Sequence, residues 1–303
     1  MTSTSPAASA SSAAENLRTP GARAAARAAC SSPAARKLSA AEEALVAGEV
    51  DLVVYRTSEV PPELPSGVVL AAYLRRNTPF DVLVTLDAET LDELPRGSRV
   101  FARSLRRRGQ LANYRSDVEW VEARGTLRQW RRDLDAGTCR ALVVAADTVE
   151  SLGLQELVGE ILSPGVCLPA PGQGGLGLAA RHEAKEVLRL LRSANDKGTE
   201  AEVTAELAVL RGLGLESAGS VGALAHVSGS SLSVDGVVVG SDDGDMARYQ
   251  VEGDLAAAAE LGAQLAERLL DLGADEFLRA PRRRAGRGRG VPGSGGAGGG
   301  GSV

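Results

Sequence analysis

The chain has 303 residues, of which 44% are hydrophobic and only 3% are aromatic. This length is enough for two or three small domains, whose cores must be built from Ala, Val and Leu. The net charge of −5 argues against nucleic acid as the main partner.

Several kinds of site are also disfavoured. The three cysteines, Cys30, Cys139 and Cys167, lack the spacing of a metal site or of a disulfide framework. Two histidines are too few for a histidine-based metal centre, so no metal is expected. No apolar run is long enough to span a membrane, and the N-terminus lacks the pattern of a secretory signal. We therefore expect a cytoplasmic monomer.

Both ends of the chain have the composition of disordered segments. Residues 1–34 are rich in Ala and Ser and contain almost no large apolar side chain. The one regular element that this segment suggests is a short alanine-rich helix over residues 22–29. Residues 281–303 are rich in Arg and Gly and are likewise expected to be disordered.

The first folded elements indicate an α/β arrangement. Ser39 is the expected N-cap of a helix over residues 39–46, and a buried parallel strand follows over residues 51–55. The proline-rich residues 56–65 are expected to form a loop. This loop leaves the carboxyl end of a buried strand, where open α/β sheets bind their ligands. Glu59 is therefore a candidate functional residue, with an ordinary solvated glutamate as the alternative.

The middle of the chain continues the alternation of strands and helices. Strands are predicted over residues 68–73, 81–84, 99–102, 118–121 and 142–146. A glycine-rich loop over residues 168–177 indicates a tight backbone turn. We expect domain 1 to comprise residues 35–78 and 175–195, and domain 2 to comprise residues 79–174.

The last region has a different pattern. A helix with apolar residues at Val203, Leu207 and Leu210 precedes three strands, over residues 223–227, 232–240 and 247–251, with a turn expected at Asp235-Gly236. A leucine-striped helix over residues 261–272 should cover this antiparallel sheet. The region is predicted to be a small α+β domain 3 over residues 198–280.

Arginine dominates residues 96–132, where the acidic residues are Asp117, Glu119 and Glu122. Ser104 is the expected N-cap of a helix, and free N–H groups beside guanidiniums would hold carboxylates or phosphates. A solvated arginine face is the alternative. A local basic face on an acidic protein suits a small polyanion.

Several strings, taken in order, resemble the porphobilinogen deaminase (hydroxymethylbilane synthase) family from about residue 39 to residue 278. They include Pro62-Glu63-Leu64-Pro65, Ser104-Leu105-Arg106-Arg107, Leu168-Pro169-Ala170-Pro171-Gly172-Gln173-Gly174 and Gly273-Ala274-Asp275-Glu276. The resemblance implies two doubly wound, periplasmic-binding-protein-like domains and a small α+β third domain. It also implies a dipyrromethane cofactor on a cysteine of the third domain, and the joining of four porphobilinogens to hydroxymethylbilane for haem and related tetrapyrroles.

The resemblance also assigns roles to residues. Glu59 stands at the position of the family's catalytic aspartate, which stabilises positive charge on the pyrrole nitrogens. Arg106, Arg107 and Arg124 match arginines that bind the acetate and propionate groups of the pyrroles. Ser217 stands at the position of the cofactor cysteine.

The chain departs from the family where the chemistry takes place. The family's HSxKD loop reads Tyr55-Arg56-Thr57-Ser58-Glu59, so a glutamate replaces the aspartate and Ser58 replaces the lysine. Trp130 replaces the second arginine of the RGNxxTR motif, and Ser151 replaces a further arginine. A serine hydroxyl is far less nucleophilic than a thiolate, so Ser217 cannot form the usual thioether.

The N-terminal part of the family pattern is the least preserved. Residues 18–29 are expected to be a remnant of the family's TRxSxLAxxQ helix. The family's first strand and mobile lid have no visible counterpart, which should expose an edge of the first sheet.

Three interpretations follow. The chain is a working deaminase with altered parts, or a non-catalytic binding or regulatory paralogue that still recognises a small acidic pyrrole or a linear tetrapyrrole. The third interpretation is a decaying product that barely folds. A solute-binding role would rest on fold analogy alone.

Overall fold

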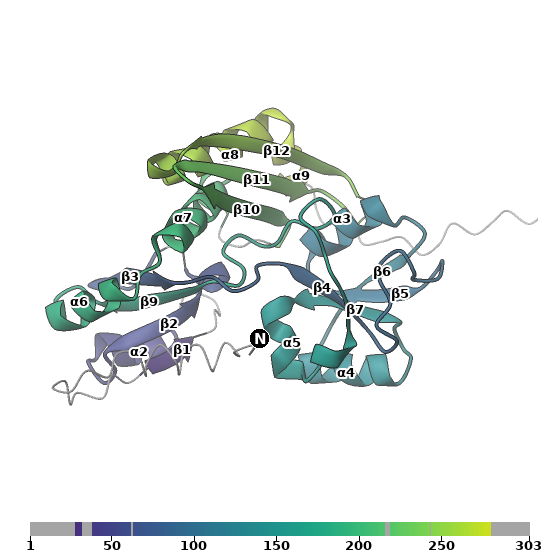
Figure 1. The fold of residues 1–303 in the computed structure, drawn as a ribbon, viewed down its shortest axis with the longest axis horizontal. Coiled ribbons are helices and arrows are strands. Elements are labelled where there is room, and N and C mark those ends of the chain that lie inside the picture. Colours follow the sequence, from purple (N-terminus) through teal and green to yellow (C-terminus); the bar gives the residue numbers. More distant parts are fainter. Residues whose placement is uncertain (1–27, 32–37, 62, 216–218, 243, 280–303) are drawn as a thin grey trace, which may run out of the picture.

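The computed structural model describes residues 28–31, 38–61, 63–215, 219–242 and 244–279, which form three sheets with their helices. Figure 1 shows the three-stranded sheet and its helices lying across the four-stranded and five-stranded sheets. No helix in these ranges is both long and apolar enough to cross a membrane.

The four-stranded unit has the strand order β1-β2-β9-β3 and a helix on each face. Its elements are β1 (Ala28–Ser31), α2 (Ala40–Val46), β2 (Leu52–Arg56), η1 (Thr57–Glu59), β3 (Val68–Leu74), β9 (Leu176–Arg181) and α6 (Lys185–Ser193). Because side chains alternate along a strand, Val54 packs in the cluster that contains Leu188 of α6, while Val53 packs in the cluster that contains Leu45 of α2. Ser39 caps α2 in a capping box with Glu42, as the sequence indicated.

Strand β1 corrects two expectations for the N-terminal segment. Residues 28–31, expected to be disordered or at the end of an alanine-rich helix, pair in parallel with β2. The expectation that the first strand is missing is therefore wrong. The physical reason is that β2 is a buried strand whose N–H and C=O groups need partners on both sides, and a neighbouring extended segment satisfies them. The expected helix over residues 22–27 and the rest of that segment lie outside the described residues.

The structure also shortens the loop predicted after residue 55. Strand β2 includes Arg56, and the 3-10 helix η1 follows directly. The prolines that motivated the loop begin only at Pro61, so the backbone before it keeps its N–H donors and is free to form regular structure.

The five-stranded unit has the order β6-β5-β7-β4-β8. Its elements are β4 (Asp81–Thr85), β5 (Arg99–Ala102), α3 (Leu105–Tyr114), β6 (Glu119–Glu122), α4 (Leu127–Asp135), β7 (Ala141–Ala145), α5 (Ala146–Leu152), η2 (Gln155–Leu157) and β8 (Val158–Ile161). Strands β6, β5 and β7 are parallel, and β4 runs antiparallel to β7 and β8. Helix α3 packs on one face and α4 and α5 pack on the other, so the predicted α/β fold class is confirmed.

The three-stranded unit is an antiparallel sheet covered by helices. Its elements are α7 (Lys197–Gly212), β10 (Val221–Ser228), β11 (Ser231–Val239), β12 (Met246–Asp254), η3 (Leu255–Ala257), α8 (Ala258–Asp271) and α9 (Ala274–Arg279). The turn predicted at Asp235-Gly236 is wrong, because both residues lie in the middle of β11. Gly236 is there because Leu265 and Leu269 of α8 pack directly against its Cα, where a Cβ would lie about 2.9 Å from Leu265.

The chain crosses between the four-stranded and five-stranded units twice, over residues 75–80 and over residues 162–175. These two chain crossings lie against each other. The Asn77 N–H donates to the Gly174 carbonyl oxygen at 3.2 Å. Gly174 has a φ of +79°, and a Cβ on it would lie 2.7 Å from the Thr78 carbonyl oxygen. The glycine-rich loop thus lets the two crossings touch.

The close contact between α7 and α8 yields a stability prediction. A Cβ on Gly262 would lie 2.2 Å from the Ala205 carbonyl oxygen and 2.6 Å from the Ala208 Cβ. We expect Gly262→Ala to lower the free energy of unfolding by about 1–3 kcal/mol, although alanine is the better helix former by about 1 kcal/mol. Urea unfolding followed by circular dichroism measures this change.

The matched control is Gly198→Ala, also in a helix. There the nearest atom to an added Cβ is an Asp196 carboxylate oxygen at 3.4 Å, which is an ordinary contact. We expect this variant to be as stable as the parent chain or slightly more stable. Equal stability of the two variants would show that the helix contact at Gly262 is not tight.

Candidate functional site

A cavity of about 430 Å³ lies between the five-stranded and three-stranded units. It sits at the carboxyl ends of the parallel strands β5 and β6, where an α/β sheet presents loops and helix starts to a ligand. Its lining residues are Arg103, Ser104, Leu105, Arg108, Glu122, Arg124, Gly219, Gly240, Ser241 and Asp242.

The start of helix α3 shapes this cavity. The Ser104 hydroxyl accepts a hydrogen bond from the Arg107 N–H at 3.3 Å, which confirms the predicted N-cap. The preceding N–H group of the helix, that of Arg106, donates to the Gly219 carbonyl oxygen at 3.0 Å. The cavity wall is therefore joined across the two units by a backbone hydrogen bond.

The three arginines of the cavity wall differ in their partners. Arg108 donates to the Asp242 carboxylate at 2.7 Å and is neutralised by it. Arg124 is 83% exposed and lies 3.8 Å from the exposed Glu122 carboxylate, a weak pairing. Within the described part of the chain Arg103 forms no ion pair, and its guanidinium stacks 5.7 Å from the centre of the Trp130 ring. Arg103 and Arg124 are thus the cations available to an anion in the cavity.

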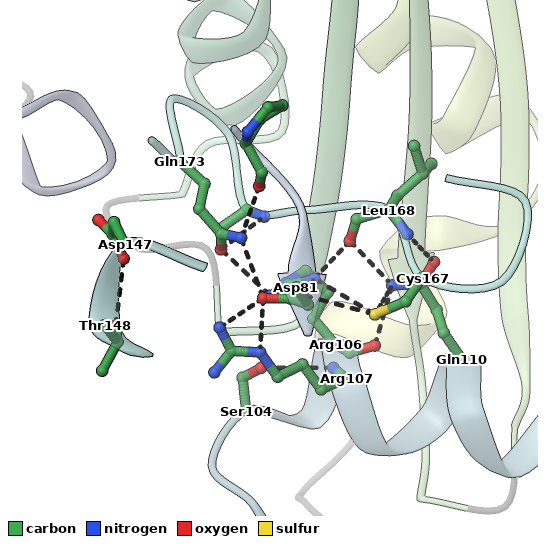
Figure 2. Close-up of polar contacts among 12 residues, drawn as sticks. Asp81, Ser104, Arg106, Arg107, Gln110, Asp147, Thr148, Cys167, Leu168 and Gln173 are labelled. Carbon is green, nitrogen blue, oxygen red and sulfur yellow. Dashed lines mark hydrogen bonds and ion pairs between the residues drawn. The ribbon is translucent and has the colours of Figure 1, made fainter. Parts of the chain in front are cut away.

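Arg106 and Arg107, the other two predicted carboxylate ligands, both contact Asp81 (Figure 2). Arg106 donates to one Asp81 oxygen at 2.8 Å, and Arg107 donates to the other at 2.7 and 3.1 Å. Asp81 is fully buried, and the two guanidiniums oppose the effect of burial and hold the pKa of its carboxyl well below the usual range. The network is a buried ionic triad inside the protein.

The glycine-rich loop is anchored to the same triad. The Gln173 amide donates to Asp81 at 2.9 Å and to the Pro79 carbonyl oxygen at 2.7 Å. Gln110 of α3 exchanges two hydrogen bonds with the backbone of Leu168, at 2.9 and 3.2 Å. Arg106 also donates to the Leu168 carbonyl oxygen, so the start of the loop is tied to α3 and its middle, at Gln173, to β4.

Glu206 connects the two chain crossings to the three-stranded unit. Its fully buried carboxylate accepts from both terminal nitrogens of Arg76, at 2.6 and 2.9 Å. It also accepts from the Gly172 N–H at 2.6 Å and from the Ala225 N–H at 2.9 Å. Four donors satisfy the charge and fix α7 and β10 against the crossings.

Glu59 ends the 3-10 helix that follows β2. Burial raises the pKa of its carboxyl, the nearby Arg56 opposes this, and Asp147 of α5 raises the pKa further. Arg56 itself donates to Asp147 at 3.0 Å, which links the four-stranded unit to the five-stranded unit beside Glu59.

The predicted site residues therefore fall in three places. Arg124 lines the cavity, Arg106 and Arg107 share Asp81, and Glu59 stands near the Arg56–Asp147 pair. Ser217 lies outside the described residues, and the cavity residue Gly219 follows it by two positions.

Three further residues, Asp81, Glu206 and Arg103, form the surroundings of the site and were not predicted from the sequence. Asp81 is the one charged residue of the buried strand β4, and an isolated charge at the start of such a strand indicates a buried partner. Arg103 is one of many arginines in this part of the sequence, and it differs from its neighbours in following directly after β5.

Comparison with known proteins gives a consistent family. Residues 37–189 match a family profile described as porphobilinogen deaminase, dipyromethane cofactor binding domain. The chain is 38% identical over 246 residues to the porphobilinogen deaminase of Pelotomaculum thermopropionicum, covering 81% of this chain and 79% of the relative. It is 42% identical to that of Roseiflexus castenholzii, covering 78% of each, and 41% identical to that of Rubrobacter xylanophilus, covering 78% and 77%.

Solved structures show weaker likeness. A lipoprotein of the YaeC family from Enterococcus faecalis covers 51% of this chain and 74% of its own, with a TM-score of 0.34 and 12% identity. A likeness this weak carries no conclusion about the chain.

The Asp81 triad yields the second prediction. Asp81→Asn leaves two guanidiniums, one of them fully buried, without their counter-charge, and we expect it to lower the free energy of unfolding by about 3–5 kcal/mol. Urea unfolding at pH 7 measures this. Because the folded-state pKa of Asp81 is lowered, its stabilisation is present above its ordinary pKa of 3.8 and is lost as the pH falls below it. The difference between the two proteins should therefore narrow below about pH 4.

The control is Glu119→Gln, which removes an exposed ion pair with Arg99 at 3.2 Å. We expect a change below about 1 kcal/mol. A D81N protein as stable as E119Q at pH 7 would contradict the assignment of the triad as a structural centre.

Proposed function

This chain belongs to the porphobilinogen deaminase family, whose enzymes make hydroxymethylbilane for tetrapyrrole synthesis, and from that premise we propose that it binds an acidic pyrrole or a short linear pyrrole chain in the cavity. The observation that carries the proposal is the pair Arg103 and Arg124 on the cavity wall, neither of them neutralised by a buried carboxylate. Guanidinium groups bind carboxylates through two parallel hydrogen bonds, and each pyrrole of this pathway carries an acetate and a propionate.

The roles predicted for Arg106 and Arg107 stay predictions. Arg106 is almost completely buried, whereas the Arg107 side chain is 13% exposed. Arg107 is the better placed of the two to reach a ligand, and it would share its donors between the ligand and Asp81. Arg106 supports the proposal indirectly, because its N–H and guanidinium hold the cavity wall and the glycine-rich loop in place.

The family's dipyrromethane fits the charges of this site, but the site does not offer the family's covalent attachment. Its carboxylates match Arg103 and Arg124, and when bound it supplies the primer to which pyrroles are added. The family's attachment position lacks a thiol, because position 217 is a serine, and burial raises the pKa of the two cysteine thiols that the structure describes, Cys139 and Cys167, to about 12. We therefore propose non-covalent binding.

A second candidate function is the family's transferase reaction, centred on Glu59. The supporting observation is that Glu59 follows a buried strand next to the charged pair Arg56 and Asp147, at the position of the family's aspartate. An ionised carboxylate there would stabilise positive charge on a pyrrole nitrogen as ammonia leaves. The extra methylene of a glutamate shifts that charge and should slow the reaction.

Intact mass spectrometry of the parent chain and of S217C tests the proposed function. We expect the parent chain to show the bare polypeptide mass, unchanged by incubation with porphobilinogen. In S217C the new thiolate attacks the aminomethyl carbon of porphobilinogen, so that a C–S bond forms, the C–N bond breaks and ammonia leaves. We expect this variant to gain the mass of pyrrole units.

Other outcomes separate the two candidates. Stepwise gains of one pyrrole unit on the parent chain would support the transferase reaction and overturn non-covalent binding. A bare mass for both proteins, together with no binding of porphobilinogen in calorimetry, would refute the proposed site.

Arg124 provides a further prediction. Arg124→Gln removes one carboxylate ligand, and we expect it to weaken porphobilinogen binding by about tenfold or more, as for the loss of a charge-assisted hydrogen bond. The matched control is Arg96→Gln, which changes a 90% exposed arginine of the same unit outside the cavity and should leave the affinity unchanged. Equal losses in the two variants would indicate a diffuse charge effect instead of a binding site.

A further inference from the structure

Trp130 contacts both arginines that the cavity offers to an anion. Its indole N–H donates to the Arg124 carbonyl oxygen at 2.7 Å, and its ring face lies 5.7 Å from the Arg103 guanidinium carbon. The two arginines come from different loops, one after β5 and one after β6. Trp130 therefore contacts both of these loops.

The ring of Trp130 is held rigidly. Only 2% of the residue is exposed, and it packs in the cluster that contains Leu134 of its own helix and Leu142 of β7. The indole N–H bond closes the turn at Gly125 that leads into α4, whose N-cap is Thr126. The ring therefore gives the Arg103 guanidinium a fixed surface to stack on, and its N–H holds the Arg124 backbone in place.

Such a support affects binding because a free arginine side chain loses much conformational freedom when it grips a carboxylate. Stacking restricts the Arg103 side chain, and the indole hydrogen bond fixes the backbone from which the Arg124 side chain extends, so part of the entropic cost is met before the ligand arrives. The resemblance places an arginine of the RGNxxTR motif where this chain has Trp130. Where the family has a third cation, this chain therefore has a neutral side chain that supports Arg103 and Arg124.

We propose that Trp130 is a positioning residue that presets Arg103 and Arg124 to grip two carboxylates, the acetate and the propionate of a single pyrrole. The inference rests on the proposed function and deepens it. Two preset arginines should favour a ligand of one pyrrole unit over a long polyanionic chain. Trp130 itself does not line the cavity and acts through the two arginines.

The test compares Trp130→Phe with Trp120→Phe, using porphobilinogen as the probe in calorimetry. W130F keeps an aromatic face for Arg103 but removes the donor to Arg124, and we expect porphobilinogen affinity to fall about fivefold to tenfold, as for one lost hydrogen bond. W120F also loses an indole N–H bond to an arginine carbonyl, that of Arg115 at 3.0 Å, but Trp120 lies outside the cavity. We expect its affinity to be unchanged.

A second measurement does not require W130F to fold. The chain has two tryptophans, so in W120F protein Trp130 is the only one. A carboxylate bound to the stacked Arg103 guanidinium should partly neutralise the charge beside the ring, and we expect saturable binding of porphobilinogen to change Trp130 emission. Adding Arg103→Gln should abolish that emission change.

The outcomes separate this inference from the proposed function. If neither the parent chain nor W120F binds porphobilinogen, the proposed function is wrong and the role of Trp130 falls with it. If both bind, and W130F binds equally well or Trp130 emission is unchanged at saturation, only the positioning role is overturned. Tighter binding of hydroxymethylbilane than of porphobilinogen by more than tenfold would overturn the preference for a single pyrrole.

Discussion

The buried carboxylate of Asp81 is the constraint on which the site depends. It enters the interior at the first residue of β4 and neutralises two guanidiniums at the start of α3, where neither charge would be stable alone. The amide of Gln173 binds the same carboxylate, so the glycine-rich loop, the helix and the strand are held by one charge (Figure 2). Because α3 begins at the cavity, the position of the cavity wall follows from this triad.

A second buried carboxylate, Glu206, extends the same logic to the third unit. It binds Arg76 and the backbone of both Gly172 and Ala225, and so connects the two crossings with α7 and β10. The glycine-rich loop contacts both carboxylates, because Gln173 donates to Asp81 of β4 and Gly172 donates to Glu206 of α7. The framework between the units therefore depends on these two buried carboxylates and on the groups that donate to them.

Local pattern was sufficient for much of the fold. The N-caps at Ser39 and Ser104 follow from side-chain chemistry within three residues, and the apolar runs of β2, β4 and β7 mark buried strands because no polar residue interrupts them. The sequence pattern predicted the wrong element where tertiary packing determines the local structure. Asp235-Gly236 has the composition of a turn but lies in a strand under Leu265 and Leu269, and residues 28–31 have no strand signal but pair with the open edge of β2. Strands β8 and β9 were missed, since each is short or follows a glycine-rich loop.

The sequence by itself determined the family, the α/β class and the chemical character of the site, because ordered motifs and residue types are properties of the chain alone. It also predicted where that chemistry is altered, at Trp130 and Ser217. Only the tertiary structure decided which arginine serves which partner. Arg103, Arg106, Arg107 and Arg124 are indistinguishable as residue types, but a buried carboxylate 25 residues before Arg106 takes two of them, and an indole ring supports the other two. Electrostatic pairing depends on distance and burial, and both are set by how the strands and helices pack.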